Sequence, residues 1–216
     1  SDILRTVPGV SVSNTGGLGQ PSAVFLRGSE SDHVLVLIDG VKVGSTTLGS
    51  TSFQFLDPDQ IERIEVVRGP RSSLYGPDAI GGVIQIFTRD PDKAPRASAF
   101  ATGGTDDYSK FGARLSAGGN ATKFSIGANY EKSTGYDVCK GSTTAGCFTF
   151  EDDLDGYENL SVQAKLAGSL NEQTDFSVSY LSSTGETEYD GSFSNETDFA
   201  VSVLGAQLNV NASERL

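Results

Sequence analysis

The stretch Ile64–Arg89, IEVVRGPRSSLYGPDAIGGVIQIFTR, decides the fold of this chain. It predicts a strand, a glycine-rich loop and a second strand, because two β-branched runs flank a Gly-Pro stop and a short turn. Gly76, Gly81 and Gly82 allow backbone conformations in the loop that other residues rarely adopt. Taken alone, the pattern also fits a buried strand–loop–strand connection in any α/β domain.

Two upstream segments narrow the interpretation. They are LRTVPGV at residues 4–10 and VFLRGSESDHVLVLIDG at residues 24–40. In this order, the three segments resemble the plug domain of TonB-dependent outer-membrane receptors. The resemblance implies an α+β plug followed by antiparallel strands of a transmembrane β-barrel in the bacterial outer membrane. The barrels of this family have about 22 strands.

Composition argues against several other classes of protein. The net charge of −12 over 216 residues disfavours binding to nucleic acid or to an anionic membrane surface. No run approaches the ~18 apolar residues of a transmembrane helix, although strands of about ten residues can still cross a membrane. No catalytic residues are predicted: His33 is the single histidine, and there is neither a phosphate loop nor a nucleophile elbow. We therefore expect no enzymatic activity.

We divide the chain into a plug at residues 1–90, a proline-containing linker at residues 91–96, and the first barrel strands at residues 97–216. The chain opens inside a predicted helix, so we expect a trimmed N-terminus. We also expect truncation at Leu216, because about six strands cannot close around a plug of this size.

About six segments of the barrel part alternate between apolar and other residues, as Phe124, Ile126 and Ala128 do with the residues between them. A soluble antiparallel sandwich and a transmembrane barrel both produce this pattern. Connection lengths favour the barrel, because long links alternate with short turns, as external loops alternate with periplasmic turns. The long links are at residues 103–110, 131–158 and 183–198, and the short turns are at residues 118–121 and 170–173.

One strand departs from the simple alternation. Within Phe199–Val210 the apolar phase changes between Val203 and Leu204. A phase change of this kind predicts a β-bulge, or a strand that leaves the bilayer at that point.

Within the family, the chain is most similar to the members that transport cobalamin (vitamin B12). This similarity implies a set of substrate contacts on the plug loops and one outer loop: Thr15, Pro21, Ser22, Ala23, Glu30, Leu48, Gly49 and Gly191. It also implies calcium as a cofactor that orders acidic outer loops, because calcium prefers several carboxylate oxygens on flexible backbone. The implied ligands are Asp137, Glu151, Asp153, Asp155, Tyr189, Asp190 and Asp198.

The long acidic loop also holds both cysteines, Cys139 and Cys147. They could be free thiols, but a local disulfide is the expected state on a cell-surface loop.

The resemblance implies energised uptake of a cobalamin-like small molecule. The resemblance also implies two kinds of partner: TonB with the inner-membrane energising complex, and outer-membrane lipid. We expect five arginines to hold the plug through ion pairs with acids of the barrel lumen. They are Arg27, Arg63, Arg68, Arg71 and Arg89. Two alternatives remain open, namely a siderophore (ferric chelate) receptor of the same family and a non-transporting structural or adhesin barrel.

Overall fold

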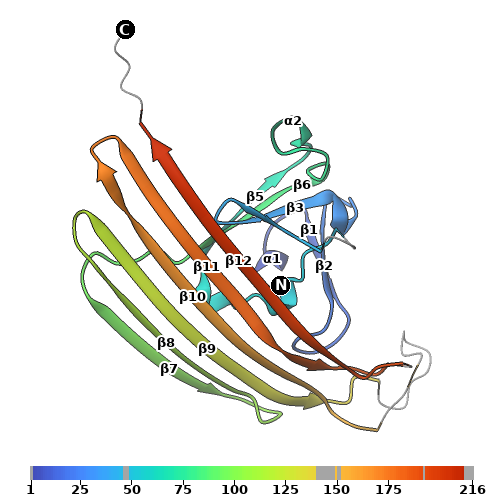
Figure 1. Cartoon of the computed structure of the whole chain (residues 1–216). Coiled ribbons are helices and arrows are strands. Elements are labelled where there is room, and N and C mark those ends of the chain that lie inside the picture. The colour runs from blue at the N-terminus through green and yellow to red at the C-terminus, as the bar shows by residue number, and fades with distance from the viewer. Residues whose placement is uncertain (1, 46–48, 140–148, 150–151, 192, 212–216) are drawn as a thin grey trace.

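Figure 1 shows the computed structural model of the chain. It describes residues 2–45, 49–139, 149, 152–191 and 193–211. Within these residues, no helix is both long enough and apolar enough to cross a membrane.

The first part of the chain forms a small mixed domain of two sheets. β1 and β2 make a two-stranded antiparallel hairpin, and the second sheet has the order β4-β3-β6-β5. β3 pairs with β6 in parallel, and the other pairings of that sheet are antiparallel. The elements are α1 (Asp2–Arg5), β1 (Val10–Asn14), β2 (Ser22–Leu26), η1 (Ser31–His33), β3 (Val34–Ile38), β4 (Val41–Val43), η2 (Phe53–Phe55), η3 (Pro58–Gln60), β5 (Ile61–Arg68), α2 (Ser72–Tyr75) and β6 (Gly82–Thr88).

The predicted strand–loop–strand stretch is the centre of this domain. β5 and β6 pair antiparallel, and β6 lies between β5 and β3. Ile84 and Ile86 of β6 are fully buried, together with Leu26 of β2. Gly82 has a positive φ of 151°, and a Cβ there would lie 2.4 Å from the carbonyl oxygen of Val67 and 2.8 Å from Leu26 Cδ1. Only glycine therefore allows the loop to enter β6 so close to its neighbours.

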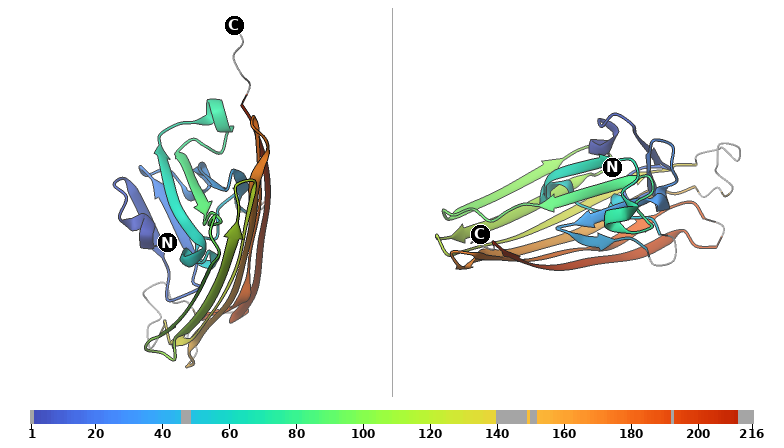
Figure 2. Two further views of the ribbon diagram at one scale, coloured as in Figure 1. Left: turned by 90° about the vertical axis from the view of Figure 1, so that its left-hand side faces the viewer. Right: turned by 90° about the horizontal axis from the view of Figure 1, so that it is seen from above.

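The second part of the chain is one curved sheet of six long antiparallel strands in the order β12-β11-β10-β9-β8-β7. These strands are β7 (Arg96–Gly103), β8 (Ser109–Gly118), β9 (Thr122–Tyr136), β10 (Asp155–Asn171), β11 (Thr174–Glu188) and β12 (Glu196–Val210). The small domain packs against the concave side of this sheet, as the edge-on view in Figure 2 shows.

The two faces of the sheet differ as the alternation predicted. We call the concave face the inner face; it carries Lys110, Ser125 and Gln163, which are buried against the first domain. The opposite, outward face carries Ile126 and Leu160, which are about half exposed. A polar face toward the plug and an apolar face toward lipid is the arrangement of a transmembrane barrel wall.

The long and short connections lie at opposite ends of the sheet, as predicted. The links of residues 104–108, 137–154 and 189–195 share one end, which we call the outer end. The turns of residues 119–121 and 172–173 lie at the other end. The plug–linker–barrel division at residues 90 and 97 stays a prediction, although β6 ends at Thr88 and β7 begins at Arg96.

The predicted bulge in the last strand is wrong. β12 pairs with β11 without any shift of register from Glu196 to Val210. Phe199 and Val203 point inward and are buried against the first domain, whereas Leu204 points outward and is 70% exposed. The apolar side chains therefore change face along a regularly paired strand, and the alternative that the strand leaves the bilayer at this point stays a prediction.

Replacing Leu204 by arginine tests the assignment of the faces. Leu204→Arg should destabilise the folded full-length barrel by about 2–4 kcal/mol, because the charge would enter the hydrocarbon layer near its midplane. Asn209→Arg, on the inner face of the same strand, should change little. The measurement is the folded fraction in lipid vesicles across a urea series. Equal effects of the two substitutions would contradict the assignment.

Candidate functional site

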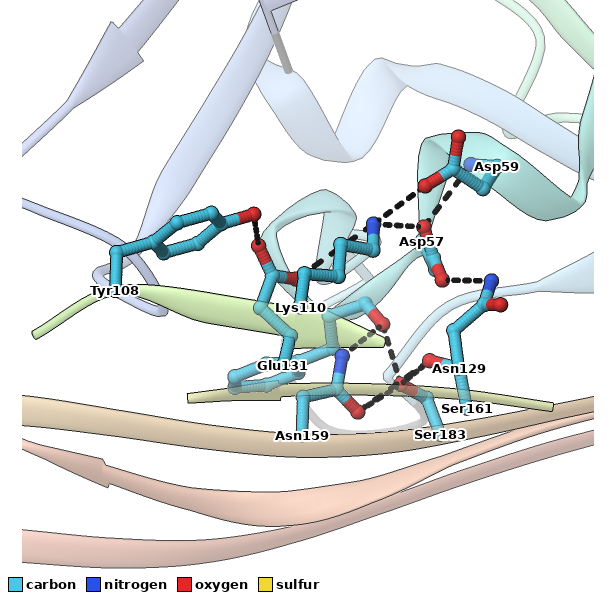
Figure 3. A network of polar contacts seen from close by, with 10 residues as sticks. Asp57, Asp59, Tyr108, Lys110, Asn129, Glu131, Asn159, Ser161 and Ser183 are labelled. Carbon is cyan, nitrogen blue, oxygen red and sulfur yellow. Dashed lines mark hydrogen bonds and ion pairs between the residues drawn. The ribbon is translucent and has the colours of Figure 1, made fainter. Parts of the chain in front are cut away.

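Lys110 joins the sheet to the plug near the outer end (Figure 3). It extends from the inner face of β8 and is 7% exposed. Its Nζ lies 2.8 Å from Asp57 Oδ1 and 2.7 Å from Asp59 Oδ2 of the plug. Glu131 Oε2 of β9 lies 4.0 Å away, at the limit of an ion pair. A lysine of the wall is thus held between carboxylates of both domains.

The local sequence explains why the Asp57 carboxylate has a fixed orientation. Asp57 caps η3, with its Oδ1 accepting a bond of 2.9 Å from the backbone N of Asp59, and Pro58 occupies the first helical position. Asn129 Nδ2 of β9 donates to Asp57 Oδ2 at 2.5 Å. A buried carboxylate is tolerated only when its oxygens are paired in this way.

The outer link of residues 104–108 is connected to the same group. Tyr108 OH donates to Glu131 Oε1 at 2.7 Å. Burial, together with this hydrogen bond to a carboxylate, raises the pKa of Tyr108 to about 12. Asp106 and Asp107 both have positive φ values, and the carbonyl oxygen of Asp106 accepts hydrogen bonds from Ser133 and Thr134. The link is therefore fixed to β9 despite a strained backbone.

A second contact holds η2 against the sheet. Ser183 Oγ donates to the carbonyl oxygen of Phe55 at 2.5 Å, and Asn159 Nδ2 lies 3.5 Å from the same oxygen. The Phe55 ring stacks on Phe199 of β12 with centroids 3.8 Å apart and planes 8° apart. Backbone and ring of one plug residue thus bind three strands of the wall.

A third contact lies nearer the short turns. Lys165 Nζ of β10 lies 2.8 Å from Asp90 Oδ1 and 3.5 Å from Asp39 Oδ1. Gln207 Nε2 of β12 donates to the carbonyl oxygen of Asp39 at 2.7 Å. Burial is the largest single effect on the pKa of Asp90 and raises it, but the hydrogen bond with Lys165 and the charges of Lys165, Lys123 and Arg63 together lower that pKa. Arg114 of β8 donates to the carbonyl oxygen of Asp90 at 2.8 Å.

The six described strands do not supply the predicted acidic partners of the plug arginines, so these contacts stay a prediction for other strands of the barrel. Among the described residues, none of the five plug arginines forms an ion pair with an acid of the six strands; Arg63 pairs with Glu65 of its own strand, and Arg68 donates to the carbonyl oxygen of Pro8. In these six strands the charges are reversed, because basic side chains of the wall hold acids of the plug. The sequence signal for this was present, since Lys110 and Lys165 stand at inner-phase positions of their strands.

The loop between β1 and β2 reaches the outer end and is attached there. Gln20 Nε2 donates to the carbonyl oxygen of Glu188 at 2.7 Å. A Cβ at Gly19, which has a φ of +74°, would lie 2.3 Å from the ring of Tyr157. The plug hairpin thus touches the wall beside the base of the β11–β12 link.

The predicted substrate contacts fall into separate places. Thr15, Pro21, Ser22 and Ala23 share the hairpin, where the backbone N of Thr15 donates to the carbonyl oxygen of Pro21 at 3.2 Å. Glu30 lies beyond the opposite end of β2.

The other three predicted contacts lie in loops. A Cβ at Gly49 would lie 3.2 Å from Cβ of Asp32, so Gly49 is near Glu30 in space. Gly191 lies in the β11–β12 link, and Leu48 lies outside the described residues.

A cavity of about 770 Å³ lies between the hairpin, η2, η3 and the inner face. Its lining includes Leu18, Phe53, Tyr108, Lys110 and Tyr157. Aromatic surfaces with a few charged groups are typical of a site for an amphipathic organic ligand.

Some of the predicted calcium ligands come together at the outer end. Asp155 is buried at the start of β10, and its Oδ2 accepts a bond of 2.8 Å from the backbone N of Val138. Asp137, Asp153 and Asp190 lie close enough to act on its charge. Asp137 Oδ1 is buried and has no hydrogen-bond partner among the residues that the structure describes. The chemistry of these oxygens suits a hard cation.

The remaining predicted ligands lie elsewhere. Asp198 is exposed on the outward face opposite Glu186, and Tyr189 OH bonds Thr197 Oγ1 at 2.9 Å. Glu151 lies outside the described residues. Across the described ranges, no three His, Cys, Asp or Glu side chains are arranged to hold a metal ion. Cys139 is disulfide-bonded, while Cys147 lies outside the described residues, so their pairing stays a prediction.

Comparisons with known proteins agree with this geometry. The family model described as TonB-dependent Receptor Plug Domain matches residues 1–83. Vitamin B12 transporter BtuB of Vibrio vulnificus is 39% identical over 189 residues, which are 87% of this chain and 30% of that protein. The protein of the same name from Photobacterium profundum is 37% identical over 191 residues, 88% of this chain and 30% of that protein.

Solved structures show the same architecture. The siderophore receptor PirA from Acinetobacter baumannii matches with a TM-score of 0.67 and 25% identity, covering 88% of this chain and 30% of that one. Copper transporter OprC matches with a TM-score of 0.75 and 20% identity over 99% of this chain and 32% of that one, which shows the fold alone. The chain spans about 30% of the length of the curated relatives it matches.

Replacing Lys110 by methionine tests the contact between plug and wall. Lys110→Met should lower the stability of the docked plug by about 3–5 kcal/mol in the full-length receptor, because Asp57 would stay buried without its cation. Hydrogen exchange of the η3 and β5 amides measures this. Lys132→Met removes an exposed pair with Glu158 on the outward face and should leave the exchange unchanged. Equal exchange in both variants would refute the contact.

The ionisation of Tyr108 tests its bond to Glu131. Tyrosine ordinarily has a pKa of 10.0 and Tyr108 has one of about 12, so the stability from this bond is present below pH 10 and lost as pH rises through about 12. A phenolate absorbance titration of the full-length receptor, with Tyr108→Phe subtracted, measures this pKa. Glu131→Gln should lower it toward 10. A subtracted signal already centred at pH 10 would count against the bond.

Proposed function

We propose that this chain, which belongs to the TonB-dependent receptors and has their plug domain at residues 1–83, forms part of a receptor that takes up cobalamin or a related corrinoid. TonB-dependent receptors are transporters of the bacterial outer membrane, and this location applies to the chain. The main support for the substrate is the identity of 39% and 37% to two vitamin B12 transporters over almost nine tenths of the chain.

The plug contacts suggest how uptake proceeds. In this proposal the six strands belong to a closed barrel of about 22 strands, whose outward face contacts lipid. The cargo binds at the outer end against the hairpin loop that carries Thr15, Pro21, Ser22 and Ala23. TonB, driven by the inner-membrane energising complex, then pulls the plug, and the contacts of Lys110 and Lys165 open. Each contact is a discrete ion pair, so the plug has a docked and a released state.

Calcium is a proposed cofactor of the outer end. Asp137, Asp153, Asp155 and Asp190 would have to move closer together to hold it, because no three of these carboxylates are arranged around one point in the described part of the chain. Support comes from the repulsion between their charges and from a buried oxygen of Asp137 without a hydrogen-bond partner among the described residues. A bound cation would neutralise these groups and join the base of the β9–β10 link to the β11–β12 link. The joined links would then position the cargo over the hairpin.

A siderophore receptor is the second candidate function. PirA, a siderophore receptor, matches the chain at a TM-score of 0.67 and 25% identity. A siderophore receptor would use the same contacts between plug and sheet. These contacts therefore do not distinguish the two candidate functions. The higher identity to the vitamin B12 transporters favours cobalamin.

The test is a titration of the detergent-solubilised full-length receptor with cyanocobalamin, first with calcium and then with chelator. We expect saturable binding that weakens by about 5- to 150-fold on chelation, the usual range for two coupled sites. Asp155→Asn should reproduce the chelator effect, and Asp198→Asn should not. Binding that is indifferent to calcium would reject the cofactor and keep the cargo. Absence of binding, with binding of a ferric siderophore instead, would favour the second candidate.

A further inference from the structure

The inner face of the sheet carries a descending row of basic side chains. The row consists of Lys110, Arg114, Lys165 and Lys123, all at inner-phase positions of β8, β9 and β10. Arg96 of β7, which pairs with Ser116, lies on the same face. The row begins at the plug contact near the outer end and continues toward the short turns.

The register of the strands gives the spacing of this row. Arg114 lies four residues beyond Lys110 on β8. Lys165 of β10 pairs with Ser125 of β9, and Ser125 pairs with Ser116 of β8. Lys165 therefore lies at the level of Ser116, two residues beyond Arg114. Lys123 of β9 pairs with Gly118 of β8, which lies two residues beyond Ser116. At ~3.4 Å per residue the row extends about 27 Å along the strands, and with a strand tilt of about 45° it covers roughly two thirds of the thickness of a hydrocarbon layer.

Apart from apolar side chains such as Leu181 and Val203, the rest of this surface is polar, and it is free of carboxylates. Between the level of Glu131 and the level of Asp175, the inner face of the described strands holds no acid. Ser161 and Gln163 of β10 and Ser125 of β9 fill the spaces between the bases. A hydroxyl- and amide-lined surface with repeated cations can hydrogen-bond phosphate or carboxylate oxygens along its length.

The acids that neutralise the row come from the plug and its linker. Asp57 and Asp59 pair with Lys110, and Asp39 and Asp90 pair with Lys165. Asp92 of the linker lies 3.8 Å from Arg114. When the plug is released, Asp39, Asp57 and Asp59 leave with it, and Lys110 and Lys165 lose these partners. A charge left unpaired in a confined site is costly, so another anion is drawn to it.

We propose that this row is a guide for an anionic group of the cargo, a phosphate or a carboxylate, which replaces the departing plug carboxylates base by base. The inference rests on the proposed uptake function and adds the chemistry of the path. Lys110, Arg114 and Lys165 each exchange a carboxylate of the plug or linker for an oxyanion of the cargo, and Lys123 adds a cation that no plug acid occupies. A cargo without an anionic group gains nothing from the row.

Lys123 allows the guiding of the cargo to be tested separately from the docking of the plug. Among the described residues, Lys123 forms no ion pair, whereas Lys110, Arg114 and Lys165 all contact plug or linker acids. Lys123 lines a cavity of about 250 Å³ together with Lys165 and Asp90. The charge of Lys123 acts on Asp90 without forming an ion pair with it, so neutralising Lys123 removes a guiding charge while the ion pairs between plug and wall stay in place. Lys132, on the opposite face of the same strand, is the matched control.

The experiment compares two cargoes in cells that carry the full-length receptor. Cyanocobalamin has a phosphate diester, and cobinamide is the corresponding corrinoid without the nucleotide and its phosphate. Equilibrium binding and initial uptake are measured for the parent, Lys123→Gln and Lys132→Gln. We expect Lys123→Gln to slow cyanocobalamin uptake about fivefold, the size of one charge contact near a surface, with binding unchanged. Cobinamide uptake should not change, and Lys132→Gln should affect neither cargo.

Three results would overturn the guide. Normal binding with unchanged cyanocobalamin uptake in Lys123→Gln overturns this inference alone. Equal slowing of both cargoes also overturns it, because the effect would then be independent of the anionic group. Failure of the parent to bind either corrinoid overturns the proposed function and this inference with it.

Discussion

The structure depends on one desolvated cation, Lys110, which is held between Asp57 and Asp59 of the plug. A buried lysine adds little stability on its own, but removing its partners is expensive, so it defines a docked state sharply. The cap on η3 orients Asp57, and Asn129 satisfies its second oxygen. Lys165 repeats the arrangement nearer the short turns. The plug is therefore fixed by a few discrete contacts, which suits a domain that must be released.

Most of the architecture follows from sequence pattern. Period-two alternation predicts the six long strands, and loop lengths predict which ends of the strands lie together. The alternation wrongly predicted a β-bulge within Phe199–Val210, where apolar residues occur on both faces of the strand. There the wall contacts the plug through Phe199 and Val203 and faces outward through Leu204. A single strand cannot reveal which of its faces meets another domain, so only the tertiary contact resolves it.

The candidate site was less predictable, because its geometry depends on register between distant segments. The hairpin residues around Thr15 and Pro21 were placed together, but Glu30 lies at the other end of β2. The plug arginines were expected to bind wall acids, whereas the six described strands supply cations. Lysines at inner-phase positions such as Lys110 were the available signal, since a cation facing a plug needs an acidic partner there. Its partners at Asp57 and Asp59 are about 50 residues away in sequence and could not be assigned by spacing.

The coupling energy between Lys110 and Asp57 tests the central claim most directly. A double-mutant cycle with Lys110→Met and Asp57→Asn, which keeps the cap, would follow plug stability by hydrogen exchange in the full-length receptor. The account predicts that the double variant is less destabilised than the sum of the single variants, with a coupling of roughly 1.5–3 kcal/mol. Additivity within about 0.5 kcal/mol would show that the two side chains do not depend on each other, and would contradict the account.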